Sequence, residues 1–498
     1  MPCLPGVFCG RQLGSIRVNS IAALPLVDEH VMFFGKFNSA KWGKNFRPNE
    51  VFFLIDYFYF CENVYFCGKF KIMQGKEYKP RVIDKLLSRK LQGKGAVLIE
   101  GAKWCGKTSS AEQQAKSIVY MSDPKLINSY LSFVDTNPEM ILDGETPRLI
   151  DEWQLAPKLW DQIRFTVDHR SGMGQYILTG SAVPADKSQI HHSGTGRFAR
   201  LLMRPMTLWE SGESNGKISL SDMFDTPETI AAECSLSLPR IAFLTCRGGW
   251  PQSVGFDNDI ALDQALDYYD LVVESDIQRA DGVSRNPNRA KQLMRSYARM
   301  QGSQSSLNEI FNDMQSNDHG QMDVQTISSY LDALRLIFVI EDMPAWNPNL
   351  RSKTAIRTSA TRYFVDPSIA AAALGIGPSD LINDLETFGL LFETLAVRDL
   401  RVYAQANDGE VFHYRDKSGL ECDAVIHLRN GHYGLVEIKL GGDLAIEAGA
   451  ATLKKLGDKI DTTKMKHPSF LMVLTAVGRF AYRRSDGVYV VPIGCLRN

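Results

Sequence analysis

The stretch GAKWCGKTSS, residues 101–110, follows the apolar run 96–99 and has the residue spacing of a phosphate-binding loop. Glycines at positions 101 and 106 let backbone N–H groups wrap a phosphate, and a helix that starts after the loop adds the positive end of its dipole. Lys107 is expected to reach the β- and γ-phosphates, and the Thr108 hydroxyl is expected to coordinate Mg²⁺. The residues predicted to bind a nucleoside triphosphate are Gly101, Ala102, Lys103, Trp104, Cys105, Gly106, Lys107, Thr108 and Ser109.

The flanking sequence predicts the elements on which such a loop depends. Residues 82–91 carry apolar side chains at helical spacing, residues 96–100 read as a strand, and residues 110–119 are expected to continue as a helix. A second strand that ends in acidic residues follows in PRLIDEWQ, residues 147–154. Asp151 is expected to hold Mg²⁺ through water, and Glu152 is expected to polarise the attacking water.

Two arginines follow in a loop of small residues, HHSGTGRFAR, residues 191–200. Such a loop can carry Arg197 or Arg200 close to the γ-phosphate of its own or a neighbouring subunit, where it neutralises charge in the transition state. The alternative is that one or both arginines pair with nearby carboxylates. Arg204 is a weaker candidate for the same role.

The bulk composition excludes several classes of protein. The chain has 498 residues, enough for two to four domains, with ordinary hydrophobic (44%) and charged (23%) content. The net charge of −1 means that any nucleic-acid site must be a local patch. Nine irregularly spaced cysteines and the lack of a long apolar run predict a soluble protein of the reducing cytoplasm, with no membrane partner.

Residues 1–72 are unlike the rest of the sequence. The segment 51–70 is crowded with aromatic residues and has neither a helical nor an alternating period. Four cysteines fall in this region, but their spacing does not favour a zinc site; they are Cys3, Cys9, Cys61 and Cys67. We expect Met73 to be the natural start and residues 1–72 to be a translated upstream region or a poorly ordered extension.

Several motifs carry a family resemblance that extends from about Tyr78 to the C-terminus. They are YKPRVID (78–84), LIEGAKWCGKTSSAEQ (98–113), LIDEWQ (149–154), YILTGSAVP (176–184), HSGTGRFARLLMRPMTLWESGES (192–214) and RGGWP (247–251). In order and wording they resemble the prokaryotic ATP-binding AAA proteins with a C-terminal domain of unknown function. Members of that family typically begin just before the Pro-Arg motif, which agrees with Met73 as the start.

The resemblance implies an α/β fold with ATP and Mg²⁺ as cofactors; no guanine-reading Asn-Lys-x-Asp motif is evident. In AAA-type ATPases a polar residue at the end of the strand after the acidic one senses the γ-phosphate. Thr179 fits that role, with Ser181 as the alternative. The predicted domains are an AAA-like P-loop ATPase domain over 73–240, a helical lid and winged-helix segment over 241–370, and a restriction-endonuclease-like α/β domain over 371–498.

The middle segment predicts a helix-turn-helix followed by a wing. Ser306 and Glu309 form a capping box that opens one helix, and Asp323 caps a second. Strands are expected over 337–346 and 362–366. The basic residues between or on these strands are Arg351, Lys353, Arg357 and Arg362. Because the second helix exposes mainly Gln, Ser and Asp, contact with DNA and a purely structural or partner-binding role both stay open.

The C-terminal segment contains the pattern of PD-(D/E)xK nucleases. Asp423 lies on one predicted strand, and Glu437 and Lys439 lie on the next, two residues apart and therefore on one face. The carboxylates are expected to bind a divalent cation while the lysine positions water, and Glu393 from the preceding helix is expected to complete the site. The same residues can also persist as a scaffold after activity is lost.

The sequence is therefore consistent with three alternative functions. The first is an ATP-hydrolysing AAA-type protein that binds or processes DNA or RNA through its C-terminal half. The second is a nucleotide-gated switch that recruits a protein partner or a second copy of the chain, with a vestigial nuclease-like domain. The third is a metal-dependent DNA nuclease whose ATPase module controls access.

Overall fold

The computed structural model describes residues 78–182, 189–225, 230–317, 322–348 and 359–498, together with the short strands Ile21–Ala23 and Phe33–Gly35. The chain divides into two compact units, Met1–Glu77 and Tyr78–Asn498. In the first unit, β1 and β2 are those two strands and pair antiparallel. The four cysteines considered for zinc and the predicted start at Met73 lie outside the described residues.

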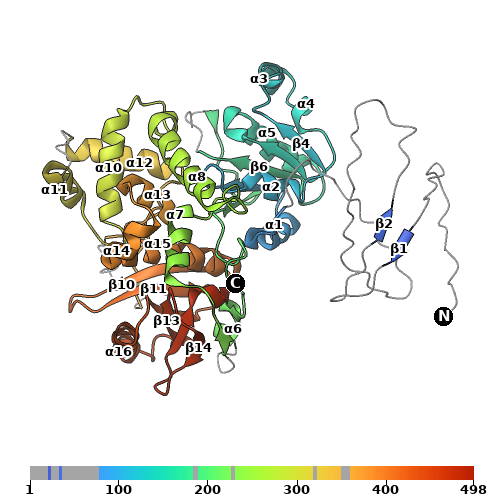
Figure 1. Ribbon diagram of the computed structural model, residues 1–498. Helices are drawn as coiled ribbons and strands as arrows, with labels where there is room; N and C mark the ends of the chain where they lie inside the picture. Colours follow the sequence, from blue (N-terminus) through green and yellow to red (C-terminus); the bar gives the residue numbers. More distant parts are fainter. Residues whose placement is uncertain are drawn as a thin grey trace, which may run out of the picture. The chain divides into compact units, whose positions relative to one another are not determined.

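The N-terminal part of the second unit is built on a five-stranded parallel sheet (Figure 1). Its order is β4-β5-β6-β3-β7, so β6 lies between the strand that precedes the glycine-rich loop and the strand that ends in acid. The strands are β3 (Ala96–Glu100), β4 (Ser117–Tyr120), β5 (Arg148–Asp151), β6 (Tyr176–Gly180) and β7 (Phe198–Leu202).

Helices cover both faces of this sheet because its strands are apolar on both sides. The helices are α1 (Val82–Gly93), α2 (Lys107–Glu112), α3 (Ile127–Thr136), α4 (Glu139–Leu142) and α5 (Leu159–His169). Along β3, Val97 and Ile99 pack in the core with α1, whereas Ala96 and Leu98 pack on the opposite side in the core with α5. Side chains that alternate in this way are what a strand buried on both faces requires.

The sequence prediction and the structure differ just after the glycine-rich loop. The expected helix over 110–119 stops at Glu112, and Ser117–Tyr120 is strand β4, which pairs with β5. Sheet pairing therefore overrides the local helical preference of this segment.

Helices form the middle of the second unit. They are α7 (Leu238–Arg247), α8 (Asn258–Leu271), a π-helical turn (Val272–Asp276), α9 (Ile277–Arg279), α10 (Pro287–Arg299), α11 (Leu307–Asn317), α12 (Val324–Leu336), α13 (Pro367–Leu374) and α14 (Pro378–Asn383). The predicted helix pair is present as α11 and α12. The two predicted wing strands form only isolated antiparallel bridges, Ile340 with Phe364 and Met343 with Thr361. Arg351, Lys353 and Arg357 lie outside the described residues.

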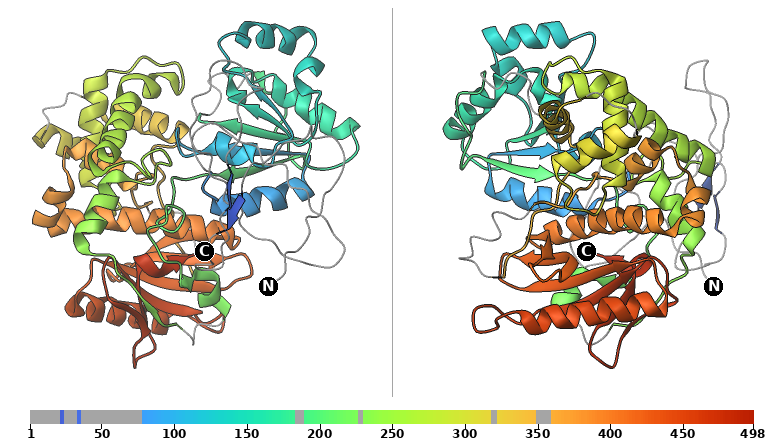
Figure 2. Two further views of the ribbon diagram at one scale, coloured as in Figure 1. Left: turned by 45° about the vertical axis from the view of Figure 1, so that its right-hand side comes forward. Right: turned by 90° about the vertical axis from the view of Figure 1, so that its left-hand side faces the viewer.

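A mixed seven-stranded sheet forms the C-terminal part, in the order β10-β11-β12-β13-β15-β14-β9. Helix α15 packs on one face of this sheet and α16 on the other (Figure 2). The elements are α15 (Leu385–Ala406), β10 (Gly409–Arg415), β11 (Glu421–Leu428), β12 (Tyr433–Lys439), α16 (Asp443–Lys459), β13 (Phe470–Thr475), β14 (Phe480–Arg483) and β15 (Tyr489–Pro492).

Two short strands from the first half of the chain complete the C-terminal part. β9 (Ala232–Glu233) pairs with β14, and β8 (Ile218–Ser219), which leads into α6 (Leu220–Asp225), pairs with β16 (Leu496–Arg497). The predicted ATPase domain over 73–240 thus contributes strands to the C-terminal sheets.

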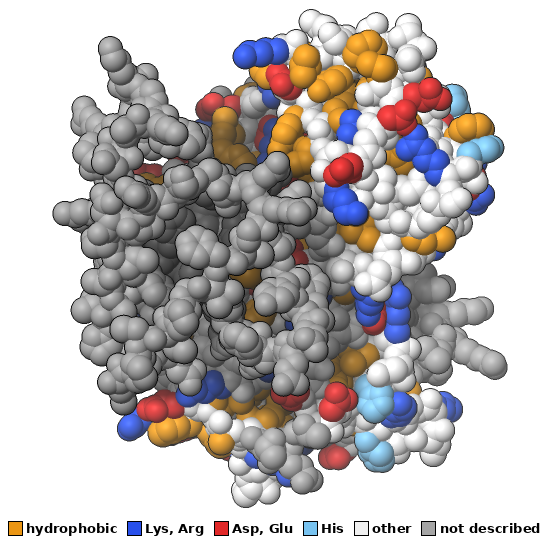
Figure 3. All heavy atoms as spheres, turned by 90° about the vertical axis from the view of Figure 1, so that its right-hand side faces the viewer, with side chains coloured by type: hydrophobic (Ala, Val, Ile, Leu, Met, Phe, Trp, Pro, Cys, Tyr) orange, Lys and Arg blue, Asp and Glu red, His pale blue; other side chains and the backbone are white. Residues whose placement is uncertain are grey.

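One face of the part built on the five-stranded sheet, the predicted ATPase domain, carries exposed apolar side chains. Figure 3 shows hydrophobic side chains gathered at the top of this face, where Figure 1 places α3 and α4. The large hydrophobic side chains exposed on α3, α4 and α5 include Leu131, Met140 and Phe165. Charged residues separate these apolar side chains from one another. The protein partner expected from the sequence therefore stays a prediction.

Candidate functional site

The glycine-rich loop depends on backbone conformations that favour glycine. Gly101 has a φ of 151°, and a Cβ built there would lie 2.1 Å from the Met203 carbonyl oxygen. Gly106 has a φ of 101° and caps the N-terminus of α2. Trp104 also adopts a positive φ, 64°, which is costly for a bulky residue. The loop is thus held in a strained shape, as is common at ligand sites.

Lys107 lies inside the loop that it is predicted to serve. Its side chain is buried, and Nζ donates to the carbonyls of Gly101 at 2.9 Å and Ala102 at 2.7 Å. The ammonium group is therefore placed within the curve of the loop, where backbone N–H groups and the start of α2 also favour an anion.

The Asp151 carboxylate lies beside the glycine-rich loop and binds hydroxyl groups from two other segments of the chain. Its Oδ1 accepts hydrogen bonds from Thr108 Oγ1 at 2.7 Å and from Thr179 Oγ1 at 2.5 Å. The cause is the strand order: β3, β6 and β5 are adjacent and parallel, so their carboxyl ends meet at one edge. The structure brings together three residues that the sequence analysis selected separately.

Glu152 follows at the same edge in a left-handed conformation with a φ of 55°. The Gln154 amide donates to its carboxylate, and Ser181 Oγ lies 3.5 Å from it. Ser181, the alternative to Thr179, thus contacts Glu152 rather than Asp151. Glu152 is next to Asp151, the predicted Mg²⁺ ligand. This position agrees with the predicted role of Glu152, which is to orient the attacking water.

The arginines that follow the loop bind carboxylates of this chain instead of lying at the loop. Arg197 forms an ion pair with Asp168 at 2.7 Å, and Arg200 lies 3.4 Å from Glu100. Arg204 binds Glu341 at 2.6 Å. Among the described contacts, none joins these arginines to the Thr108–Asp151–Thr179 cluster, so a role at the γ-phosphate stays a prediction.

Arg81 contacts the loop directly, although the sequence patterns did not predict this contact. Its guanidinium donates to the Cys105 carbonyl at 2.7 Å, to the Arg204 carbonyl at 2.8 Å and to Glu210 at 3.0 Å. The arginine is buried, so each contact is made away from water. Its place in the YKPRVID motif is the one signal that the sequence offers.

Two further loop residues contact the helical middle. Lys103 Nζ lies 2.5 Å from the buried carboxylate of Asp276, in the π-helical turn. The Trp104 ring lies 6.0 Å from the Tyr268 ring of α8 and remains half exposed. The loop is therefore in contact with the predicted lid as well as with the sheet.

The predicted nuclease residues also come together. Lys439 Nζ lies 2.7 Å from Glu437 and 3.1 Å from Asp423, and Tyr363 donates to Glu393. Burial, together with the charge of Asp423, raises the pKa of Glu393 to about 8 and that of Glu437 to about 7. Burial alone would lower the pKa of Lys439, but the neighbouring carboxylates raise it above its ordinary value.

Metal binding by these residues stays a prediction. Within the described parts of the chain, no group of three or more His, Cys, Asp or Glu side chains is placed to hold a metal ion. Lys439 forms ion pairs with the carboxylates of both Asp423 and Glu437. A cation held by Glu393, Asp423 and Glu437 would have this ammonium group as a near neighbour.

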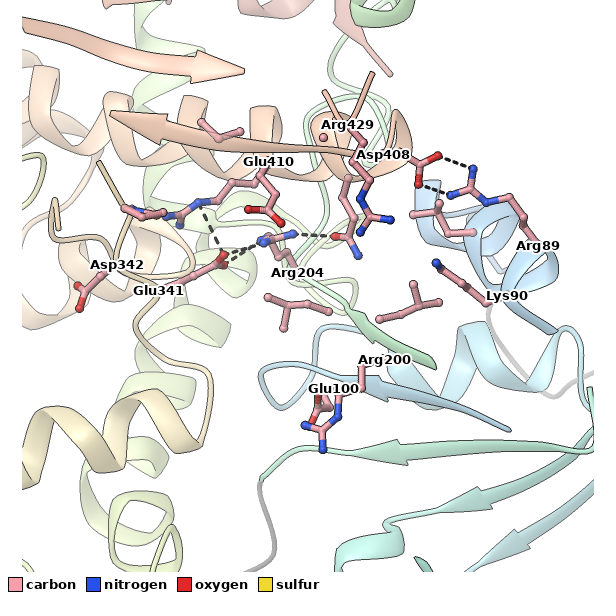
Figure 4. Close-up of a pocket in the computed structure, with 18 residues that line it drawn as sticks. Arg89, Lys90, Glu100, Arg200, Arg204, Glu341, Asp342, Asp408, Glu410 and Arg429 are labelled. Carbon is pink, nitrogen blue, oxygen red and sulfur yellow. Dashed lines mark hydrogen bonds and ion pairs between the residues drawn. The ribbon is translucent and has the colours of Figure 1, made fainter. Parts of the chain in front are cut away.

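A cavity of about 380 Å³ lies apart from both clusters (Figure 4). It is bounded by α1 and β7 of the ATPase part and by α15 and β10 of the C-terminal part. Although Glu100 immediately precedes the glycine-rich loop, no residue of 101–110 lines this cavity.

Comparisons with known proteins agree with the nucleotide site. Residues 93–211, which contain the loop and all five strands, match the family model described as an AAA domain. The match supports an AAA-type ATPase. Residues 239–380 and 388–496 match two domains of unknown function, DUF8612 and DUF4143, which leave the nuclease-like identity of the C-terminal part unconfirmed.

Two solved structures show a weaker likeness. A Walker-type ATPase of Pyrococcus abyssi is 14% identical with a TM-score of 0.35, and the match covers 58% of this chain and 94% of the other. A signal transduction ATPase with numerous domains and a tetratricopeptide repeat sensor, from Pyrococcus horikoshii, is 12% identical with a TM-score of 0.16 and shares of 66% and 50%. These scores are too low to carry an argument beyond the AAA match.

No curated protein matches the sequence. None of the described helices combines the length and apolar character needed to cross a membrane.

Proposed function

We propose that this chain hydrolyses ATP with Mg²⁺ at the glycine-rich loop and that its C-terminal half binds or processes nucleic acid under control of that reaction. The observation that supports the ATPase site is the convergence of Thr108 and Thr179 on Asp151 beside the loop. When bound, Mg²⁺ would neutralise charge on the β- and γ-phosphates, and Thr108 and Asp151 are the residues suited to hold it.

Each residue then has a distinct task. Lys107 and the loop N–H groups hold the phosphates, and Glu152 orients the attacking water. The Thr179 hydroxyl donates to the same carboxylate oxygen of Asp151 as Thr108, and from there it can respond to the γ-phosphate. Arg197 and Arg200 are exposed, so either can reach a neighbouring copy of the chain in a homo-oligomer once its ion pair opens.

A route from the loop to the C-terminal half supports coupling between them. Arg81 joins the Cys105 carbonyl to Glu210 and to the Arg204 carbonyl. Arg204 in turn donates to Glu341 and to Gln405 near the end of α15. A loop that changes shape on binding ATP would therefore displace groups that also contact α15.

ATP hydrolysis with and without nucleic acid tests this proposal. Phosphate release is measured for the wild type, for Lys107→Ala and for the control Lys85→Ala, an exposed lysine on α1. We expect Lys107→Ala to lose turnover, Lys85→Ala to keep it, and DNA or RNA to stimulate the wild type. Turnover in Lys107→Ala equal to the wild type would exclude the loop as the site.

Failure of nucleic acid to stimulate turnover would favour a different use of ATP. The chain would then act as a nucleotide-gated switch that recruits a protein partner. Size measurements with and without ATP identify a second copy as that partner if the mass doubles.

The cluster of Glu393, Asp423, Glu437 and Lys439 favours a second candidate function, a metal-dependent nuclease. Cleavage of supercoiled DNA with Mg²⁺ or Mn²⁺ is compared between the wild type, Glu437→Gln and Glu447→Gln, whose exposed carboxylate lies on α16. Nicking that is lost only in Glu437→Gln supports the nuclease. Equal background nicking in all three excludes it.

A further inference from the structure

The cavity between the ATPase part and the C-terminal part is lined mainly by charged side chains (Figure 4). Its bounding elements come from both halves: α1 and β7 on one side, and the end of α15, the start of β10 and the turn after β11 on the other. The cationic residues are Arg89, Lys90, Arg200, Arg204, Arg401 and Arg429, and the acidic residues are Glu100, Glu341, Asp342, Asp408 and Glu410. We call this cavity the cationic cleft.

Most of the carboxylates in the cationic cleft are already neutralised. Arg89 donates two hydrogen bonds to Asp408, at 2.8 and 2.6 Å. Arg204 binds Glu341 at 2.8 and 2.6 Å, and Arg401 lies 3.7 Å from the same carboxylate. Burial alone would raise the pKa of Glu341, but the two guanidinium groups lower it to about 2. Both carboxylates therefore stay ionised and paired.

Asp342 is neutralised from outside the cleft. Its carboxylate accepts from Arg335 at 2.7 Å and from Arg362 at 3.2 Å, neither of which lines the cavity. Figure 4 shows Asp342 set apart from the centre of the cleft, where Arg204 lies. Its negative charge therefore does little to offset the arginines and lysine that face the open space.

Lys90 and Arg429 face the cleft without such a partner. Among the described residues, no carboxylate lies within ion-pair distance of either side chain. Both point toward the space beside Arg204 in Figure 4. Their charge is felt there, because the pKa of Asp408 is lowered chiefly by Arg89 and further by Arg429 and Lys90. Two unpaired cations that converge on one cavity create a site for an anion.

The rest of the lining indicates which kind of anion suits the cleft. Its apolar residues are Leu86, Leu201, Leu202, Pro344 and Val411, so no aromatic ring is available among the lining residues for a base to stack on. Contacts from Lys and Arg to phosphate need no such platform and are independent of sequence. The lining thus fits a phosphate group better than a nucleobase.

We propose that the cationic cleft binds a backbone phosphate of nucleic acid, with Lys90 and Arg429 as the principal contacts. The proposal rests on the proposed function and gives its nucleic-acid partner a place of contact. A strand held in the cleft touches α1 and β7 of the ATPase part and β10 of the C-terminal part at once. Glu410, which has no ion-pair partner among the described residues, opposes this binding.

Fluorescence anisotropy of a labelled short duplex DNA, in EDTA and across a range of salt concentrations, tests the proposal. The wild type is compared with the double variant Lys90→Gln/Arg429→Gln, with Glu410→Gln, and with Lys455→Gln and Lys454→Gln combined as a control on α16. Two lost phosphate contacts should lower the slope of log affinity against log salt by about 2. Glu410→Gln should strengthen binding, and the control should change neither quantity.

The possible outcomes distinguish failure of the proposed binding site from failure of the proposed function. Equal losses in the double variant and in the α16 control would overturn the site, because only net charge would matter, while nucleic-acid binding would stand. DNA binding that no variant changes would overturn the site alone.

Inorganic pyrophosphate serves as the second probe, in the same proteins, with thermal unfolding as the check that each variant is folded. If the wild type binds pyrophosphate in the cleft but not duplex DNA, the phosphate comes from a small ligand and the nucleic-acid proposal is overturned. If it binds neither, the cleft and the nucleic-acid part of the function both fail, and ATP hydrolysis in the same samples reports separately on the loop.

Discussion

The carboxylate of Asp151 shows how a buried charge can be kept ready for a ligand. Its Oδ1 accepts from two hydroxyls, Thr108 and Thr179, and the residue is only 7% exposed. A buried charge without partners costs several kcal/mol, so the two hydroxyls stabilise this carboxylate. A hydroxyl also turns easily toward a new acceptor or a metal.

We expect Thr179→Val to slow ATP turnover more than it weakens ATP binding. Valine keeps the shape of threonine but loses the hydroxyl that donates to Asp151 and is predicted to sense the γ-phosphate. Loss of one such polar group lowers kcat by on the order of a hundredfold, with KM little changed. The control is Thr245→Val, whose buried hydroxyl donates only to the Ile241 carbonyl; an equal effect there would refute the assignment.

We expect Gly101→Ala to destabilise the chain and abolish nucleotide binding. A Cβ at residue 101 would lie 2.1 Å from a backbone oxygen, and the φ of 151° disfavours alanine. The cost should be about 1–3 kcal/mol, read from chemical denaturation. Gly389→Ala in α15 is the matched control, because a Cβ there meets nothing within 4 Å and should stabilise the helix by about 0.5–1 kcal/mol. A harmless Gly101→Ala would contradict the close approach.

At the scale of elements, α15 contributes residues to several of the sites in the second unit. This 22-residue helix carries Glu393, one of the predicted nuclease residues, and Gln405 of the cationic cleft. Between them, Asp399 accepts from the Leu208 backbone N–H at 2.9 Å and from Arg398. One helix therefore carries residues of both sites.

A histidine in β10 should make the stability of the folded chain depend on pH. His413 is buried in this strand, its ring nitrogens lie 3.1 Å from the Gln304 amide and the Ser359 carbonyl, and burial lowers its pKa to about 4. Between pH 6.5 and 4 the unfolded chain takes up a proton that the folded chain does not. Stability should therefore fall as the pH drops through this range.

Chemical denaturation at several pH values checks this expectation. His413 should contribute up to about 3 kcal/mol to the loss. His413→Gln, which keeps a polar side chain without titrating, should flatten the curve between pH 6.5 and 4. A variant whose stability follows the wild type across the whole range would show that other groups cause the loss.

Helices and strands could be predicted from the sequence wherever the residues of one segment alone determine its secondary structure. β3, the loop and the strand that ends at Asp151 follow from local apolar patterns and glycine spacing. The helix expected over 110–119 ends at Glu112, because the pairing of β4 with β5 is a tertiary effect that no local pattern predicts. Arg81 could not be assigned, since its partner Glu210 lies 129 residues away and no local pattern records that contact.

At the scale of the whole second unit, the two halves of the sequence are interleaved. β9 is the end strand of the C-terminal sheet, and β8 pairs with the last strand of the chain. The Ser214 hydroxyl reinforces this joint by donating to the Leu496 carbonyl at 2.7 Å. A boundary drawn at residue 240 therefore cuts through a sheet.

A chain that begins at residue 241 should be less stable than one that begins at Tyr78. Loss of β9 leaves β14 as an unprotected edge with Phe480 and Tyr482 exposed beside it, a known route to association. Size-exclusion chromatography and thermal unfolding compare the two truncated chains. Equal melting temperatures and monomeric behaviour for both would show that the pairing contributes little.

The conformation of Trp104 gives the chain an optical reporter of its own. The ring is one of seven tryptophans, half exposed in the centre of the glycine-rich loop and 6.0 Å from Tyr268. A nucleotide that enters the loop changes both the polarity around this indole and its distance from α8. The emission spectrum of the unlabelled protein should therefore shift on binding, and Trp104→Phe removes that signal while leaving the other six tryptophans in place.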